Sequence, residues 1–241
     1  MKRAAIVTVA VILAMGLFGC SAPASQGSKA GTNSNVASGS SKQSMQDLVL
    51  VDANYVASEY GLHYALEIEN PNEGYVARTV NIELTGRHPD GSIAFSESTY
   101  AYDVYPGAPF YYASAARGEG YSQGDTLEMT VSVDSSAWKK AETSLPDNLY
   151  TFENVSIAPA SRGSVSAKGE ITLTEDLSLD SIGNVKKPQI VCILRDANGA
   201  IITGFSEYAS KELRLDQATV FDINSHFDPG DYASAEMHAS F

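Results

Sequence analysis

The sequence predicts an all-β fold with two tandem immunoglobulin-like β-sandwich domains, on three observations. Apolar and polar residues alternate along short segments such as Tyr64–Ile68 and Val80–Leu84, and this is the period of strands with one buried and one wet face. Turn-forming residues cluster between the segments, as in Pro89-Asp90-Gly91. No long segment has the 3.6-residue period of a helix, and residues 135–143 around Trp138 are expected to form at most a turn or two of helix.

Landmarks recur at a nearly constant spacing in the two halves of the chain. Asp90-Gly91-Ser92-Ile93 matches Asn198-Gly199-Ala200-Ile201 at an offset of 108 residues, and Gly124-Asp125 matches Gly230-Asp231 at an offset of 106. Spacing of this kind indicates a duplicated unit of about six strands. We therefore expect one sandwich at residues 47–137 and another at 147–241, with modest freedom in the linker 141–148 unless Trp138 seals the joint.

The centre of the second half carries a family resemblance. Cys192-Ile193-Leu194-Arg195-Asp196, followed by Asn198-Gly199-Ala200-Ile201, resembles FxLYD-type domains, which are small β-sandwiches of bacterial lipoproteins. Leu194, Asp196 and Gly199 keep the leucine, aspartate and turn glycine of that family, whereas Cys192 and Arg195 replace its phenylalanine and tyrosine. The resemblance implies a domain without a catalytic set and with a binding or structural role.

The N-terminus reads as an export signal. Lys2 and Arg3 precede an apolar run, Ala4–Phe18, whose length of roughly 22 Å as a helix is short of the ~30 Å hydrocarbon core. The run ends in Leu17-Phe18-Gly19-Cys20, which resembles the lipobox of bacterial lipoproteins. The resemblance implies that residues 1–19 are removed and that a diacylglyceryl group on Cys20 anchors the chain to the cell membrane, facing outside the cytoplasm. An unlipidated signal cut after Ala22 or Ala24 is the alternative.

Residues 20–46 are expected to be a flexible tether that follows the lipidated cysteine. The segment is rich in serine and glycine and has almost no apolar periodicity, so it cannot bury enough surface to offset the entropy of ordering the chain. Such a tether serves as a spacer or is under no folding constraint.

Net charge and cysteine content argue against nucleic-acid binding and against an intramolecular disulfide. The formal net charge is −13, and an acidic chain repels phosphate backbones and anionic lipid surfaces, so no nucleic-acid partner is expected and the membrane contact is the lipid. With Cys20 lipidated, Cys192 has no cysteine partner for a disulfide. Cys192 lies in the apolar run 190–194, which predicts a strand buried on both faces and an unreactive thiol.

Motifs for catalysis or cofactors are missing from the sequence. The four histidines, His63, His88, His226 and His238, lack metal-binding spacing, and Gly204-Phe205-Ser206-Glu207-Tyr208 lacks the last glycine of a nucleophile elbow. Glu67, Glu69, Asp222 and Asp228 are interpreted as solvated charges. We therefore expect no enzyme activity, no metal and no cofactor.

Tyrosines are the one feature that suggests more than a scaffold. Tyr100, Tyr102, Tyr105, Phe110, Tyr111 and Tyr112 crowd around a Pro-Gly turn. Tyr100 and Tyr102 are expected to share one face of a strand, with Tyr111 or Tyr112 opposite them across a hairpin. Aromatic faces of this kind bind sugars or peptides, so Tyr100, Tyr102 and Tyr112 are the candidate ligand-binding residues. Cross-strand packing is the alternative interpretation.

Three functional hypotheses remain at this point. The first is a non-catalytic binding module, tethered to the membrane through Cys20, that recognises an envelope protein or a glycan. The second is a structural or assembly subunit of a cell-envelope complex. The third is an enzyme, which no sequence motif supports.

Overall fold

The computed structural model describes residues 45–142, 144–146, 148–175, 177 and 183–241. The predicted signal segment, the predicted lipidation site Cys20 and the part of the predicted tether up to residue 44 lie outside these residues. Within them the chain is all-β, as predicted, with the strands β1 (Val49–Ser58), β2 (Gly61–Glu69), β3 (Tyr75–Arg87), β4 (Ile93–Val104), β5 (Phe110–Ala116), β6 (Thr126–Val133), β7 (Trp138–Lys140), β8 (Tyr150–Pro159), β9 (Val165–Leu173), β10 (Gln189–Arg195), β11 (Ile201–Tyr208), β12 (Thr219–Asn224) and β13 (Ser234–Ser240), and a 3-10 turn at Ser161–Gly163. No helix in this part of the chain has the length and apolarity needed to cross a membrane.

The first sandwich packs the sheet β1-β2-β5 against the sheet β4-β3-β6. The alternating apolar residues of β2 and β3 point into the space between the sheets, as their period requires. The core includes Leu62, Tyr64, Leu66, Ile68, Val80, Ile82, Leu84, Leu127 and Met129.

The residues around Trp138 form a strand, which corrects the helical turn expected from the sequence. β7 pairs with the start of β3, with Ala77 opposite Trp138. Because β6 pairs with the rest of β3, β7 extends the same edge and provides partners for backbone groups that would otherwise lack them. The side chain of Trp138 packs against the first core.

The second sandwich repeats this arrangement with the sheets β12-β9-β8 and β11-β10-β13. Each strand from β8 to β13 occupies the place of a strand from β1 to β6, since β8-β9-β12 corresponds to β1-β2-β5 and β11-β10-β13 to β4-β3-β6. Its core includes Leu149, Val165, Ala167, Ile171, Leu173, Ile190, Cys192, Leu194, Phe205, Phe221, Ile223 and Phe227.

The two units have equivalent turns, with matching hydrogen bonds and glycine conformations, at positions 108 residues apart. His88 and Ser92 close the turn after β3 through a backbone hydrogen bond of 2.9 Å, and Asp196 and Ala200 close the turn after β10 in the same way, also at 2.9 Å. Gly91 and Gly199 occupy equivalent places in these turns, both with a φ of 86°. A side chain is strained in this left-handed region, which explains the recurrence of glycine.

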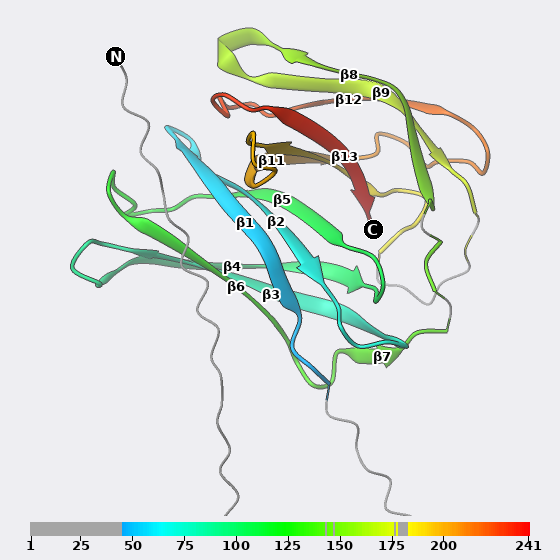
Figure 1. The fold of residues 1–241 in the computed structure, drawn as a ribbon, viewed down its shortest axis with the longest axis horizontal. Coiled ribbons are helices and arrows are strands. Elements are labelled where there is room, and N and C mark those ends of the chain that lie inside the picture. The colour runs from blue at the N-terminus through cyan, green and yellow to red at the C-terminus, as the bar shows by residue number, and fades with distance from the viewer. Residues whose placement is uncertain (1–44, 143, 147, 176, 178–182) are drawn as a thin grey trace, which may run out of the picture.

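The two sandwiches are stacked sheet on sheet, so that four sheets form consecutive layers (Figure 1). The sheet β11-β10-β13 lies against the sheet β1-β2-β5. Ala65 and Ala113 of the first unit meet Val191, Ile193 and Ile201 of the second in a small apolar cluster. Trp138 does not seal the joint, because it packs against the first core and the contact between the units is made by the sheets themselves.

Two strands at this joint are buried on both faces. In β10, Ile190, Cys192 and Leu194 face the second core, whereas Val191 and Ile193 face the first unit, as the apolar run predicts. In β2, Ala65 is 0% exposed, although the alternation places it on a wet face. The second sandwich covers that face, a contact that a local pattern cannot reveal.

Candidate functional site

Tyr100 and Tyr102 lie on the outward face of β4, as expected. Ala101 between them is buried in the first core, while Tyr100 is 52% and Tyr102 is 40% exposed. Exposed aromatic rings on a strand are available to stack against a ligand.

Tyr112 does not oppose these tyrosines across a hairpin, which corrects the sequence-based expectation. β4 pairs with β3, and β5 pairs with β2, with Tyr112 opposite Leu66. The two strands belong to different sheets because the chain crosses from one sheet to the other at the Pro-Gly turn. Tyr112 packs against the first core, and its ring centroid lies 6.3 Å from that of Tyr64.

The three candidate residues nevertheless meet at one shallow cleft, which we call the tyrosine cleft. Its lining also includes Phe110, Gln189, Tyr208, Ser240 and Phe241. Tyr208, 64% exposed, is the counterpart of Tyr100 at the offset of 108. The recurrence of Tyr-Ala in the sequence was the available signal for Tyr208, but only the stacking of the units brings both tyrosines to the same cleft.

Gln189 supplies an amide to the tyrosine cleft. It lies opposite Tyr208 in the register of β10 and β11, and its Nε2 donates to Ser206 Oγ at 2.8 Å. The amide oxygen is an acceptor, and an amide can bond to hydroxyl groups in both directions.

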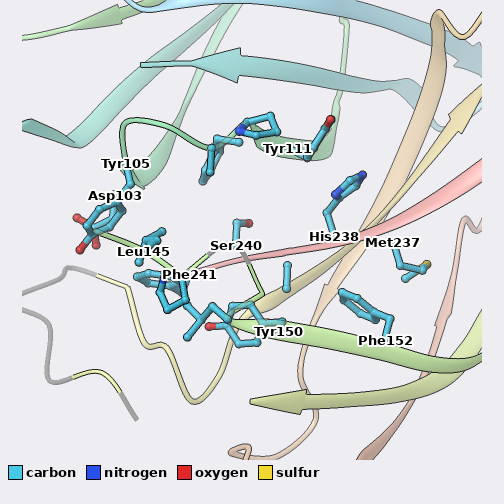
Figure 2. A pocket seen from close by; sticks show the side chains of 16 residues that line it. Asp103, Tyr105, Tyr111, Leu145, Tyr150, Phe152, Met237, His238, Ser240 and Phe241 are labelled. Carbon is cyan, nitrogen blue, oxygen red and sulfur yellow. The ribbon is translucent and has the colours of Figure 1, made fainter. Parts of the chain in front are cut away.

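A larger cleft, which we call the inner cleft, lies between the turn after β4 and the strands β8 and β13 (Figure 2). Its volume is about 340 Å³, and both sandwiches contribute its walls. The ring of Phe241 lies 6.0 Å from that of Tyr105 and 6.5 Å from that of Tyr150, between centroids. The inner cleft shares Phe110, Ser240 and Phe241 with the tyrosine cleft.

Two polar side chains of the inner cleft, Asp103 and Tyr150, already have hydrogen-bond or ion-pair partners within the protein. Asp103 is 3% exposed. Its Oδ1 lies 2.8 Å from Arg78 Nε in an ion pair, and its Oδ2 accepts from the Gly183 amide at 2.9 Å. Its φ of 54° is unusual for a residue other than glycine and costs roughly 1–3 kcal/mol of strain. The Tyr150 hydroxyl donates to the Val185 carbonyl at 2.7 Å.

Two histidines stack against aromatic rings across the joint. His63 of the first unit lies 3.8 Å from Phe227, and His238 of the second lies 3.7 Å from Tyr111, between ring centroids. Burial lowers the pKa of both imidazoles, although Glu236 opposes the effect at His238. Both stacks therefore hold neutral rings near pH 7.

Glu67 is not a solvated charge, as the sequence suggested, because it faces the second unit. Arg195 Nη2 lies 3.1 Å from Glu67 Oε2, and Arg195 Nε lies 3.0 Å from Glu236 Oε2. Asp52 Oδ2 lies 3.7 Å from Arg195 Nη1 and accepts from the Ile201 amide at 2.7 Å. One guanidinium thus joins three carboxylates at the joint.

Two observations concern metal binding and the reactivity of the buried thiol. They include no group of three or more His, Cys, Asp or Glu side chains placed to hold a metal ion. Burial raises the pKa of the Cys192 thiol to about 12, so the nucleophilic thiolate is scarce at neutral pH.

Comparison with known proteins places the chain in no family. No protein-family model matches it, and no curated protein matches it.

Proposed function

We propose that the protein is a non-catalytic binding module, held outside the cytoplasm by a lipid on Cys20, that recognises a neutral glycan at the tyrosine cleft. One observation supports this proposal above the others: exposed tyrosines from both units, Tyr100, Tyr102 and Tyr208, converge on one cleft. Sugar rings have apolar faces that stack on aromatic side chains, while their hydroxyl groups bond to amides such as that of Gln189.

The charge of the chain favours a neutral ligand. The net charge of −13 repels polyanions, and no Lys or Arg is among the described residues that line the tyrosine cleft. The tyrosine cleft has a volume of about 50 Å³, well below that of pockets that enclose a small molecule, so a ligand would lie across the exposed tyrosine rings rather than inside the cleft.

The experiment is a pull-down of residues 21–241, which hold every strand and both cores described above, on purified cell-wall glycan. Tyr100→Ala, Tyr102→Ala and Tyr208→Ala should each weaken binding, because each removes a stacking surface. Tyr60→Ala is the matched control, since Tyr60 is 70% exposed and lies outside the cleft. Equal retention of all four variants, or no binding by the parent chain, would overturn the proposal.

The lipid anchor has its own test. Cys20→Ala should release the protein from the membrane fraction, because two acyl chains are needed for stable anchoring. Globomycin should block removal of residues 1–19 from the parent chain. Unchanged membrane association of the Cys20→Ala variant together with unchanged maturation under globomycin would refute the lipidation.

The alternative role in a cell-envelope complex is tested by cross-linking in cells. Recovery of one envelope protein in stoichiometric amount, attached near Tyr100 or Tyr208, would favour the assembly subunit over the glycan-binding module.

A further inference from the structure

The inner cleft has the composition of a small-molecule site. It adjoins the tyrosine cleft, with which it shares three lining residues, but a ligand in it does not depend on glycan recognition. Its lining includes the rings of Tyr105, Tyr150 and Phe241. Rings and aliphatic groups make up the larger part of the exposed lining, and polar groups, including those of Asp103, His238 and Ser240, make up a substantial remainder. Ligand pockets typically have this balance and volumes of about 300–1,000 Å³.

The size of the inner cleft limits what it can enclose. A volume of about 340 Å³ is near the lower end of the range for ligand pockets. Figure 2 shows the rings of Tyr105, Tyr150 and Phe241 gathered at one end, with Phe152 and Met237 at the other. Flat ring faces pack best against another flat ring, with centroids about 4.5–7 Å apart.

Charge around the inner cleft disfavours an anion. Asp103 is the one carboxylate side chain among its described lining residues, and they include no Lys or Arg. His238 is held neutral by burial. Arg78 Nε lies 2.8 Å from Asp103 Oδ1, so the charge of this side chain is already compensated, and a further unpaired charge buried in the cleft is costly.

The walls of the inner cleft come from different sandwiches and are fixed by the joint. Tyr105 and Tyr111 belong to the first unit, and Tyr150 and His238 to the second. Because the sheets are packed through the cluster of Ala65, Val191 and Ile193, the cleft is preformed, and binding requires little ordering of the protein.

We propose that the inner cleft binds a neutral molecule with one or two aromatic ring systems, each a single ring or a fused pair. The hydroxyl of Ser240 and the His238 ring, both in the lining of the cleft, offer hydrogen bonds to a single polar substituent on that molecule.

The first test measures the fluorescence of N-phenyl-naphthylamine, a neutral aromatic probe, with residues 21–241. The parent chain should enhance its emission saturably, and neutral naphthol should displace it. Naphthalene sulfonate, which has the same rings but a negative charge, should displace it at least about tenfold less well. Equal displacement by both compounds, or no saturable signal, would overturn the proposal.

Variants locate the bound probe. Ala108→Phe places a ring into the inner cleft from the turn after β4, and it should weaken probe binding at least about tenfold. Tyr100→Ala and Tyr208→Ala should leave it unchanged, because these tyrosines line the tyrosine cleft and not the inner cleft. The reverse pattern would place the probe in the tyrosine cleft and refute the proposal, while leaving glycan binding to be judged by its own assay.

A second measurement avoids reliance on a variant that fails to fold. In methyl NMR spectra of the parent chain, naphthol should shift the signals of Met237 and Ala239, which line the inner cleft. Met129, in the first core, is the internal control. Shifts confined to methyl groups outside the inner cleft would contradict the assignment.

Discussion

Arg195 of the second sandwich donates from Nη2 to Glu67 Oε2 of the first at 3.1 Å, between residues 128 positions apart in the sequence. Both side chains are largely shielded from water, at 11% and 15% exposure. The same arginine contacts Glu236 at 3.0 Å. In the first unit the equivalent pair, Arg87 and Glu128 at 3.1 Å, is 42% and 46% exposed. The repeat therefore contains one ion pair twice, and its arginine is shielded from water in the second unit, at 11% exposure, but not in the first, at 42%.

Arg195→Met should destabilise the protein by roughly 2–5 kcal/mol, because Glu67 and Glu236 would remain close together without their cation. Arg87→Met is the matched control, and it should cost about 0–1 kcal/mol, as exposed ion pairs do. Urea denaturation of both variants at the same salt concentration measures the difference. Equal losses would show that the joint gains nothing from this contact.

Gly204→Ala should loosen the joint. A Cβ at Gly204 would lie 2.7 Å from the Cys192 carbonyl oxygen and 3.0 Å from Ala65 Cβ, so the sheets would have to move apart, at a cost of about 1–3 kcal/mol. Ser96 holds the equivalent position in the first unit and is exposed, so Ser96→Ala should change stability by no more than about 0.5 kcal/mol. Thermal unfolding compares the two, and no shift for Gly204→Ala would contradict the close approach.

Stability should fall as the pH is lowered through 6.5. His63 and His238 have pKa values below 6.5 in the folded chain because burial disfavours the charged ring, so the unfolded chain binds more protons in this range and protonation favours unfolding. Urea titrations between pH 7.5 and 5.5 should show this slope, and the double variant His63→Gln, His238→Gln should lose most of it. His226→Gln, at a side chain 77% exposed, should retain it.

Cys192 should resist thiol reagents until the protein unfolds. It is 0% exposed, and burial raises the pKa of its thiol to about 12. In residues 21–241, where it is the one cysteine, Ellman's reagent should label it slowly in buffer and fully in concentrated urea. Rapid labelling of the native chain would mean that β10 is accessible.

Patterns within short stretches of sequence determined the strands and the repeat. The alternation in β3 and the glycine turns at Gly91 and Gly199 depend on neighbouring residues, so they can be read directly. The apolar run through Cys192 even signalled that β10 is covered on both faces. The short strand at Trp138 was missed, because its pairing with β3 is a contact between distant residues.

Tertiary structure alone decided how the two units are joined and what their surfaces can bind. Glu67 and Ala65 appeared to be on a wet face until the second sandwich covered them. Tyr100 and Tyr208, equivalent in the repeat, share a cleft only because the units are stacked. The physical reason is that the local sequence sets which face of a strand is apolar, whereas the partner for that face is chosen by shape and charge over more than 100 residues of intervening chain.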